Sequence, residues 1–129
     1  MRATTFLMFT GDSEAWLNLV TSTVPDSRIV SIQRHGPDGP GTEGSVSMAE
    51  AVVGGIPVRC NDSPPVHEFT FTPSMSFFID LDDEAQQTAV HDALIEGGST
   101  LMPLGDYGFS QRFAWIQDRY GVSWQLNLP

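Results

Sequence analysis

The sequence predicts an α+β protein made of two β-α-β-β-β modules, whose strands form a curved mixed sheet with the helices on its outer face. The expected order of strands and helices runs through the chain twice, with an offset of about 69 residues, the distance from Thr5 to Ser74. Twelve Gly and nine Pro indicate many turns. A duplicated unit of about sixty residues cannot bury its sheet alone. We therefore expect both modules to form a single domain over 1–129, with a cavity on the concave side of the sheet.

The first module is expected over about residues 4–61 and begins with a strand and a helix. Residues 4–9 are a short apolar run, which is typical of a buried strand. Asp12 or Ser13 can cap the helix that follows. This helix should end before Pro25, because the residue preceding a proline avoids helical angles. Four helix residues are expected on one face: Ala15, Trp16, Leu19 and Val20.

Three further strands complete the first module, at residues 28–35, 45–53 and 56–61. The segment 36–44 is rich in Gly and Pro and contributes nothing to a core, so we expect a loop there. The last two strands are separated by two glycines. Such a pair is typical of a hairpin turn, because these turns need positive φ angles.

The second module is expected over about residues 74–128, after a connection at 62–73 that contains three prolines. Its helix should be capped by Asp82 or Asp83 and end at a glycine pair. Four helix residues are expected to point inward: Ala85, Ala89, Ala93 and Leu94. Its strands are expected at residues 74–80, 100–102, 111–117 and 122–128.

Charge and cysteine content exclude several classes of partner and site. The chain has 6 Lys and Arg against 16 Asp and Glu, a net charge of -10, which argues against nucleic acid and anionic membranes as partners. The single cysteine, Cys60, excludes an internal disulfide and a multi-cysteine zinc site. No stretch approaches the roughly 18 apolar residues of a membrane span. The first apolar run is too short for a secretory signal, so we expect a cytoplasmic protein.

The segment 109–125, FSQRFAWIQDRYGVSWQ, resembles a signature of the PhnB-like branch of the vicinal oxygen chelate superfamily. That superfamily also holds glyoxalase I, extradiol dioxygenases and the fosfomycin and bleomycin resistance proteins. The same resemblance is carried by residues 25–29, 41–45, 71–74, 97–98 and 101–104. It covers nearly the whole chain and implies the glyoxalase/bleomycin resistance fold and a homodimer. Members of this branch have often carried a demethylubiquinone methyltransferase label, but the chain has no Gly-rich strand-to-helix turn followed by an acidic ribose ligand.

The chemistry of the superfamily usually depends on a divalent metal held by His, Gln or Glu side chains. The resemblance places the metal-ligand positions at Thr5, Ser74 and Gln125, and near Arg59 or Cys60. Thr, Ser and Gln are neutral, Arg repels a cation, and one thiolate does not make a site. The three histidines share no ligand spacing such as i, i+4. We therefore expect no metal cofactor.

Arg112 is a basic residue in the middle of an expected strand. Alternation puts Arg112 and Ala114 on one face of that strand, with Phe113 and Trp115 on the other. A guanidinium binds carboxylates and phosphates bidentately. Arg112 either anchors an anionic ligand in the cavity or forms a structural ion pair with one of the 16 acidic residues, and the sequence leaves both interpretations open.

The same alternation of strand faces assigns the remaining candidate residues to the cavity or to the core. Gln125 is expected in the cavity and Trp124 in the core, while Phe77 and Ile79 should share a face opposite Phe78. Cys60 is placed near the cavity by the resemblance, although a buried and inert thiol is the simpler interpretation. The complete set of cavity candidates is Thr5, Cys60, Ser74, Arg112 and Gln125.

Three functions agree with these residues. The first is metal-free binding of a small organic molecule, which the weak ligand set and the expected aromatic cavity walls favour. The second is an enzyme of lyase, isomerase or transferase type. It would depend either on a metal held by other ligands or on Gln125 and Arg112 as metal-free polar groups. The third is a dimerising protein with a vestigial cavity.

Overall fold

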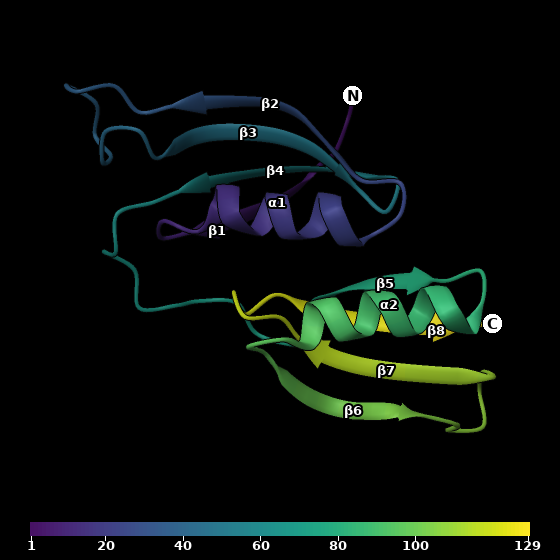
Figure 1. Ribbon diagram of the computed structural model, residues 1–129. Helices are drawn as coiled ribbons and strands as arrows, with labels where there is room; N and C mark the ends of the chain where they lie inside the picture. Colours follow the sequence, from purple (N-terminus) through teal and green to yellow (C-terminus); the bar gives the residue numbers. More distant parts are fainter. The chain divides into compact units, whose positions relative to one another are not determined.

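The computed structural model describes residues 1–129, which form two compact units, Met1–Glu68 and Phe69–Pro129. Each unit contains one strand, one helix and three further strands in that order (Figure 1). The α+β class and the duplicated β-α-β-β-β module are therefore confirmed. The boundary between the units falls inside the 62–73 connection. No helix is long and apolar enough to cross a membrane.

The first unit has a four-stranded mixed sheet. Its elements are β1 (Thr5–Phe9), α1 (Ser13–Thr23), β2 (Arg28–Arg34), β3 (Val46–Val53) and β4 (Ile56–Asp62). The strand order is β1-β4-β3-β2, and only β1 and β4 are parallel. Gly54 and Gly55 have φ angles of 56° and 85°, which confirms the predicted hairpin turn between β3 and β4.

The second unit repeats this topology. Its elements are β5 (Ser76–Asp80), α2 (Glu84–Ile95), β6 (Ser99–Gly105), β7 (Arg112–Gln117) and β8 (Ser123–Leu128). The strand order is β5-β8-β7-β6, and again only the first pair is parallel. Asp12 and Asp83, the residues at the two helix N-caps, are 71 positions apart, so the offset is 71 residues rather than 69.

Strand β6 is longer than the expected segment 100–102. Two register shifts interrupt its pairing with β7, one on each side of Met102. β6 is also an edge strand and contains Pro103. Proline has no backbone N–H, and an edge strand tolerates it because one side of the strand forms no hydrogen bonds to a neighbouring strand. Because of these irregularities, apolar and polar residues do not alternate regularly along β6, and the sequence marked only residues 100–102 as a strand.

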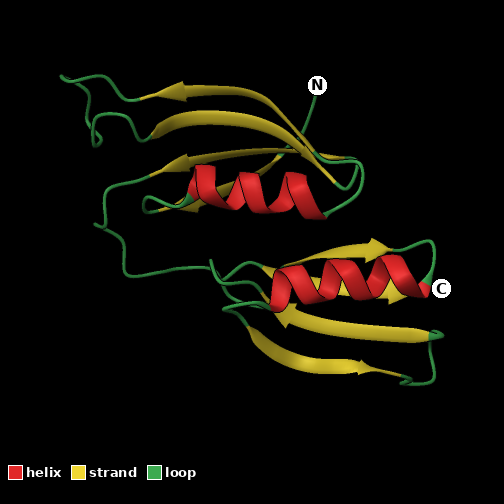
Figure 2. Ribbon diagram, viewed as in Figure 1, coloured by secondary structure: helices red, strands yellow, loops and turns green.

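Each helix packs on one face of its own sheet (Figure 2). The buried stripe of α1 is Ser13, Trp16, Leu17 and Val20, so the expected inward position of Ala15 is wrong. Helix α2 buries Gln87, Val90 and Leu94. Ala85 and Ala89 are exposed, which corrects the expected alanine face. Large side chains gain more from burial than alanine does, and they select the face.

Candidate functional site

Strand register divides the second sheet into a face covered by α2 and an opposite face. Phe77 pairs with Trp124 on the helix side, where the two rings stack with centroids 4.8 Å apart. Phe78 pairs with Gln125 on the other side, which confirms the expected separation of Phe78 from Phe77. We call this second side the open face. Its residues are Ser76, Phe78, Asp80, Phe113, Trp115, Gln117, Ser123, Gln125 and Asn127.

Four aromatic residues of the second unit form a cluster on the open face. Phe113 on β7 lies at its centre, with ring centroids 4.9 Å from Phe109, 6.1 Å from Tyr107 and 6.2 Å from Phe78. Phe113 is buried, whereas the exposed fractions of Phe78, Tyr107 and Phe109 are 51%, 39% and 62%. The aromatic cluster, Phe78, Tyr107, Phe109 and Phe113, therefore presents three rings to solvent.

Polar side chains surround the aromatic cluster on the same face. The hydroxyl oxygens of Ser76 and Ser123 lie 2.6 Å apart, and the indole N–H of Trp115 donates to Ser123 over 2.8 Å. Asn127 Nδ2 donates to Asp80 Oδ1 over 2.7 Å. Apolar and aromatic surface with a few placed polar groups is the usual chemistry of small-molecule sites.

Of the five cavity candidates, only Gln125 lies on the open face. Its strand partners there are the two aromatic residues Phe78 and Trp115. Ser74 precedes β5, which begins at Ser76, and the Ser74 hydroxyl lies 2.6 Å from that of Thr72. The expected place of Ser74 in the strand is therefore wrong, and the turn after Pro73 explains the two-residue displacement.

Arg112 faces α2 rather than the open face. Its Nη1 donates to Thr88 Oγ1 over 2.9 Å and lies 3.4 Å from Glu84 Oε1. Arg112 is thus engaged in the structural ion pair that the sequence left open, and its assignment as a cavity residue is corrected. Alternation along β7 causes this, because Arg112 shares its face with the buried Ala114.

Thr5 and Cys60 lie in the first sheet, on the side that packs against α1. They share this face with buried Leu7, which pairs with Cys60. Burial, and secondarily the charge of Asp62, raises the pKa of the Cys60 thiol to about 12. The thiol is therefore protonated at neutral pH, and it is neither a nucleophile nor a metal ligand in that form.

The residues at the implied metal positions do not fit a divalent metal. They offer two hydroxyls, one amide and one protonated thiol, and Thr5 and Cys60 lie on a packed face. No group of three or more His, Cys, Asp or Glu side chains in residues 1–129 is placed to hold a metal ion. These side chains therefore do not form a metal centre of the kind that the resemblance implies.

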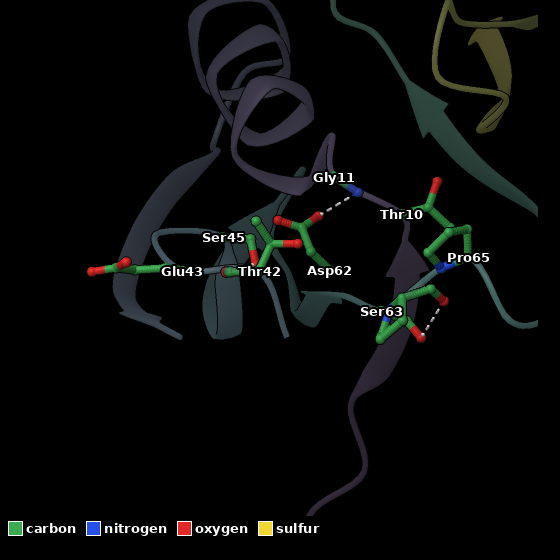
Figure 3. A pocket seen from close by; sticks show the side chains of 9 residues that line it. Thr10, Gly11, Thr42, Glu43, Ser45, Asp62, Ser63 and Pro65 are labelled. Atoms are coloured by element: carbon green, nitrogen blue, oxygen red, sulfur yellow. Dashed lines mark hydrogen bonds between the residues drawn. The ribbon is translucent and has the colours of Figure 1, made fainter. Parts of the chain in front are cut away.

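A pocket of about 270 Å³ lies in the first unit (Figure 3). Its lining residues are Thr10, Gly11, Thr42, Glu43, Ser45, Asp62, Ser63, Pro64 and Pro65. Asp62 Oδ1 accepts the backbone N–H of Gly11 and of Ser13, and Oδ2 accepts that of Val46, all within 3.1 Å. This carboxylate fastens the start of α1 to β3 and β4, so its role is structural.

Tyr107 of the aromatic cluster and Asn127 of the open face were not among the sequence candidates. The signal for Tyr107 was present in the segment 106–110, DYGFS, where two aromatic residues flank a glycine in a loop. No local pattern marks Asn127, because its position depends on pairing with β5, which is distant in the chain.

Comparisons with known proteins agree with this architecture. The family model described as 3-demethylubiquinone-9 3-methyltransferase matches residues 1–127. A putative 3-demethylubiquinone-9 3-methyltransferase, PhnB protein, from Bacillus cereus is 46% identical, with a TM-score of 0.95 over 100% of both chains. Protein PA1353 from Pseudomonas aeruginosa is 24% identical, with a TM-score of 0.83 over 99% of this chain and 97% of that one. No curated protein matches.

A more distant relative shares the fold alone. The fosfomycin resistance protein FosX from Mesorhizobium loti is 14% identical, with a TM-score of 0.61 over 100% of this chain and 91% of that one.

Proposed function

The chain belongs to the PhnB-like branch of the vicinal oxygen chelate superfamily, in the family described as 3-demethylubiquinone-9 3-methyltransferase, and from this we propose that it binds a small organic molecule without a catalytic metal. The binding surface of this proposal is the open face of the second sheet. Its ligand is a molecule with a flat apolar part, because flat rings stack well on aromatic side chains.

The observation that carries the proposal is the aromatic cluster. Soluble proteins rarely expose several large aromatic rings together unless the patch binds something. Here three of four adjacent rings are exposed, and Gln125 supplies an amide beside them. The hydroxyl and amide groups along the same face offer hydrogen bonds that would orient a bound molecule.

Methyl transfer is not part of the proposal, although the family description names it. A nucleoside-containing methyl donor is usually held at a Gly-rich turn between a strand and a helix, followed by an acidic residue that binds the ribose. The β1–α1 connection contains one glycine, and the Gly11 N–H is already bonded to the Asp62 carboxylate. This connection therefore lacks the Gly-rich turn that such a donor site needs.

We predict that 2-naphthol, a flat and mostly apolar probe, binds saturably to the protein. Phe78→Ala and Phe109→Ala should each weaken binding about three- to tenfold, because each removes one aromatic contact. Leu101→Ala is the matched control, since Leu101 is 39% exposed on β6 and lies outside the aromatic cluster. Isothermal titration calorimetry measures the affinities. Equal losses in all three variants would contradict the proposed surface.

The metal-free part of the proposal is tested separately. Chelator-treated protein should show no saturable change in thermal midpoint with Mn²⁺, Fe²⁺, Co²⁺, Ni²⁺ or Zn²⁺. A specific ion at 100 times its Kd would stabilise the fold by about 2.7 kcal/mol, which such a scan resolves. A saturable shift that Gln125→Ala abolishes would favour the metal-dependent enzyme instead.

We also propose that the protein acts as a homodimer, which the resemblance implies. Sedimentation equilibrium should then give twice the 14.1 kDa of one chain. A monomer mass at micromolar concentration would exclude this part of the proposal.

A further inference from the structure

Asn127 carries a hydrogen-bond acceptor that nothing satisfies. Its side chain lies on the open face and is only 9% exposed. The Oδ1 atom is sealed from solvent and has no hydrogen-bond partner. The Nδ2 atom donates to Asp80 Oδ1 over 2.7 Å, so the orientation of the amide is determined by a carboxylate that can only accept. A buried acceptor left unpaired costs stability, and such an atom in a native protein calls for an explanation.

Two rings of the aromatic cluster, Phe78 and Phe113, lean toward each other over the strand that carries this acceptor. Phe78 on β5 and Phe113 on β7 flank β8 on either side, and strands two apart are separated by roughly 10 Å. Their ring centroids are nevertheless only 6.2 Å apart, so the two side chains lean toward each other across β8. Asn127 pairs directly with Phe113, on the same face. The unpaired oxygen therefore lies beside the cluster.

Part of this aromatic cover is free to move. Phe78 and Phe109 are more than half exposed, so rotating either ring loses few contacts. Asn127 is held in place by Asp80. A flat ligand that stacks against a rotated ring would reach a fixed and unsatisfied acceptor.

We propose that the ligand of the open face is an aromatic molecule with an O–H or N–H donor, and that this donor binds Oδ1 of Asn127. This inference rests on the proposed function and names the chemical class that the site selects. Asn127 is then the specificity-determining residue. The exposed carboxylate of Asp80 and the net charge of -10 disfavour anionic molecules, so the ligand is neutral or cationic.

Two probes of the same ring system test the donor requirement. The first is 2-naphthol, which has one O–H donor, and the second is 2-methoxynaphthalene, which has none. At neutral pH the wild-type protein should bind the ether about tenfold more weakly, because only 2-naphthol gains a hydrogen bond to the buried acceptor. In ¹⁵N spectra, the chemical shift of the Asn127 side-chain amide should change when 2-naphthol is added and remain the same when the ether is added.

Asn127→Leu removes the acceptor and keeps a side chain of similar size. It should weaken 2-naphthol binding to the level of the ether and leave ether binding unchanged. Asn61→Leu is the matched control, because Asn61 on β4 also has an unpaired buried Oδ1, in the other module. That variant should keep the tenfold preference. If Asn127→Leu does not fold, the affinities of the two probes and the amide signal of the wild-type protein still test whether the ligand donates to Asn127.

The outcomes separate this inference from the proposed function. Equal affinities for the two probes, or a preference that survives Asn127→Leu, would overturn the role of Asn127. The open face would still stand as the binding surface if Phe78→Ala weakens both probes. Failure of both probes to bind saturably would overturn the proposed function itself.

Discussion

Replacing Gly98 with alanine is expected to lower the free energy of unfolding by about 3 kcal/mol or more, a larger loss than most single substitutions cause. A Cβ atom at this position would lie 2.0 Å from the carbonyl oxygen of Gln117 and 3.0 Å from the carbonyl carbon of Asp118. Both are backbone atoms, which cannot rotate away. Relief would require β6 to move away from β7 where Ser99 pairs with Gln117.

Gly36→Ala is the control for this substitution. A Cβ at Gly36 would meet no atom within 4 Å, so its unfolding free energy should stay within about 0.5 kcal/mol of the wild type. Urea denaturation followed by circular dichroism measures both variants. If Gly98→Ala proves as stable as Gly36→Ala, the close approach of Gly98 to the backbone of Gln117 and Asp118 is wrong.

Asp118→Ala is expected to cost about 4 kcal/mol, because it leaves several buried donors without an acceptor. The Asp118 side chain is only 3% exposed. Its Oδ1 accepts the backbone N–H of Tyr120 and of Val122, over 2.8 and 3.1 Å. Its Oδ2 accepts the indole N–H of Trp124 over 2.9 Å, and Trp124 is fully buried. One carboxylate therefore shapes the β7–β8 turn and satisfies a core tryptophan.

Asp106→Ala is the matched control for Asp118. Asp106 also accepts a backbone N–H two residues ahead, from Gly108 over 2.8 Å, but it is exposed. Water can replace that hydrogen bond, so the loss should stay below about 1 kcal/mol. Urea denaturation again gives the difference. Equal effects of the two substitutions would show that burial of the Asp118 carboxylate contributes nothing.

Local patterns predicted the order of elements and much of the sorting of side chains. Alternation placed Trp124 and Gln125 on opposite faces, and the glycine pair at 54–55 located a hairpin. Helix faces were harder. The alanines of α2 have helical spacing, yet Gln87, Val90 and Leu94 are buried instead. Gln87 enters the core because its amide donates to two backbone oxygens of β7 and β8, a contact that no local pattern reveals.

The candidate site was predicted less completely than the fold. Gln125 lies on the opposite face from Trp124 as expected, but Arg112 was kept among the cavity candidates although its alternation partner Ala114 lies in the core. Ser74 was expected in the strand that in fact begins at Ser76. The two modules were matched by their residue patterns, and such patterns do not show how many residues the turn before a strand contains. Asn127 was missed because its neighbours on the open face come from other strands, whereas Tyr107 was missed although its own segment, DYGFS, carries an aromatic signal.

The sequence by itself determined the module, its duplication, the family and the alternation of each strand, because these depend on residues close together in the chain. Only the tertiary structure decided which residues share the open face, and which helix residue Arg112 pairs with. It also decided that Asp62 and Asp118 are buried acceptors for backbone N–H groups, and that Asn127 Oδ1 has no partner. The physical reason is that burial and hydrogen bonding depend on strand register and helix packing, which join segments distant in sequence.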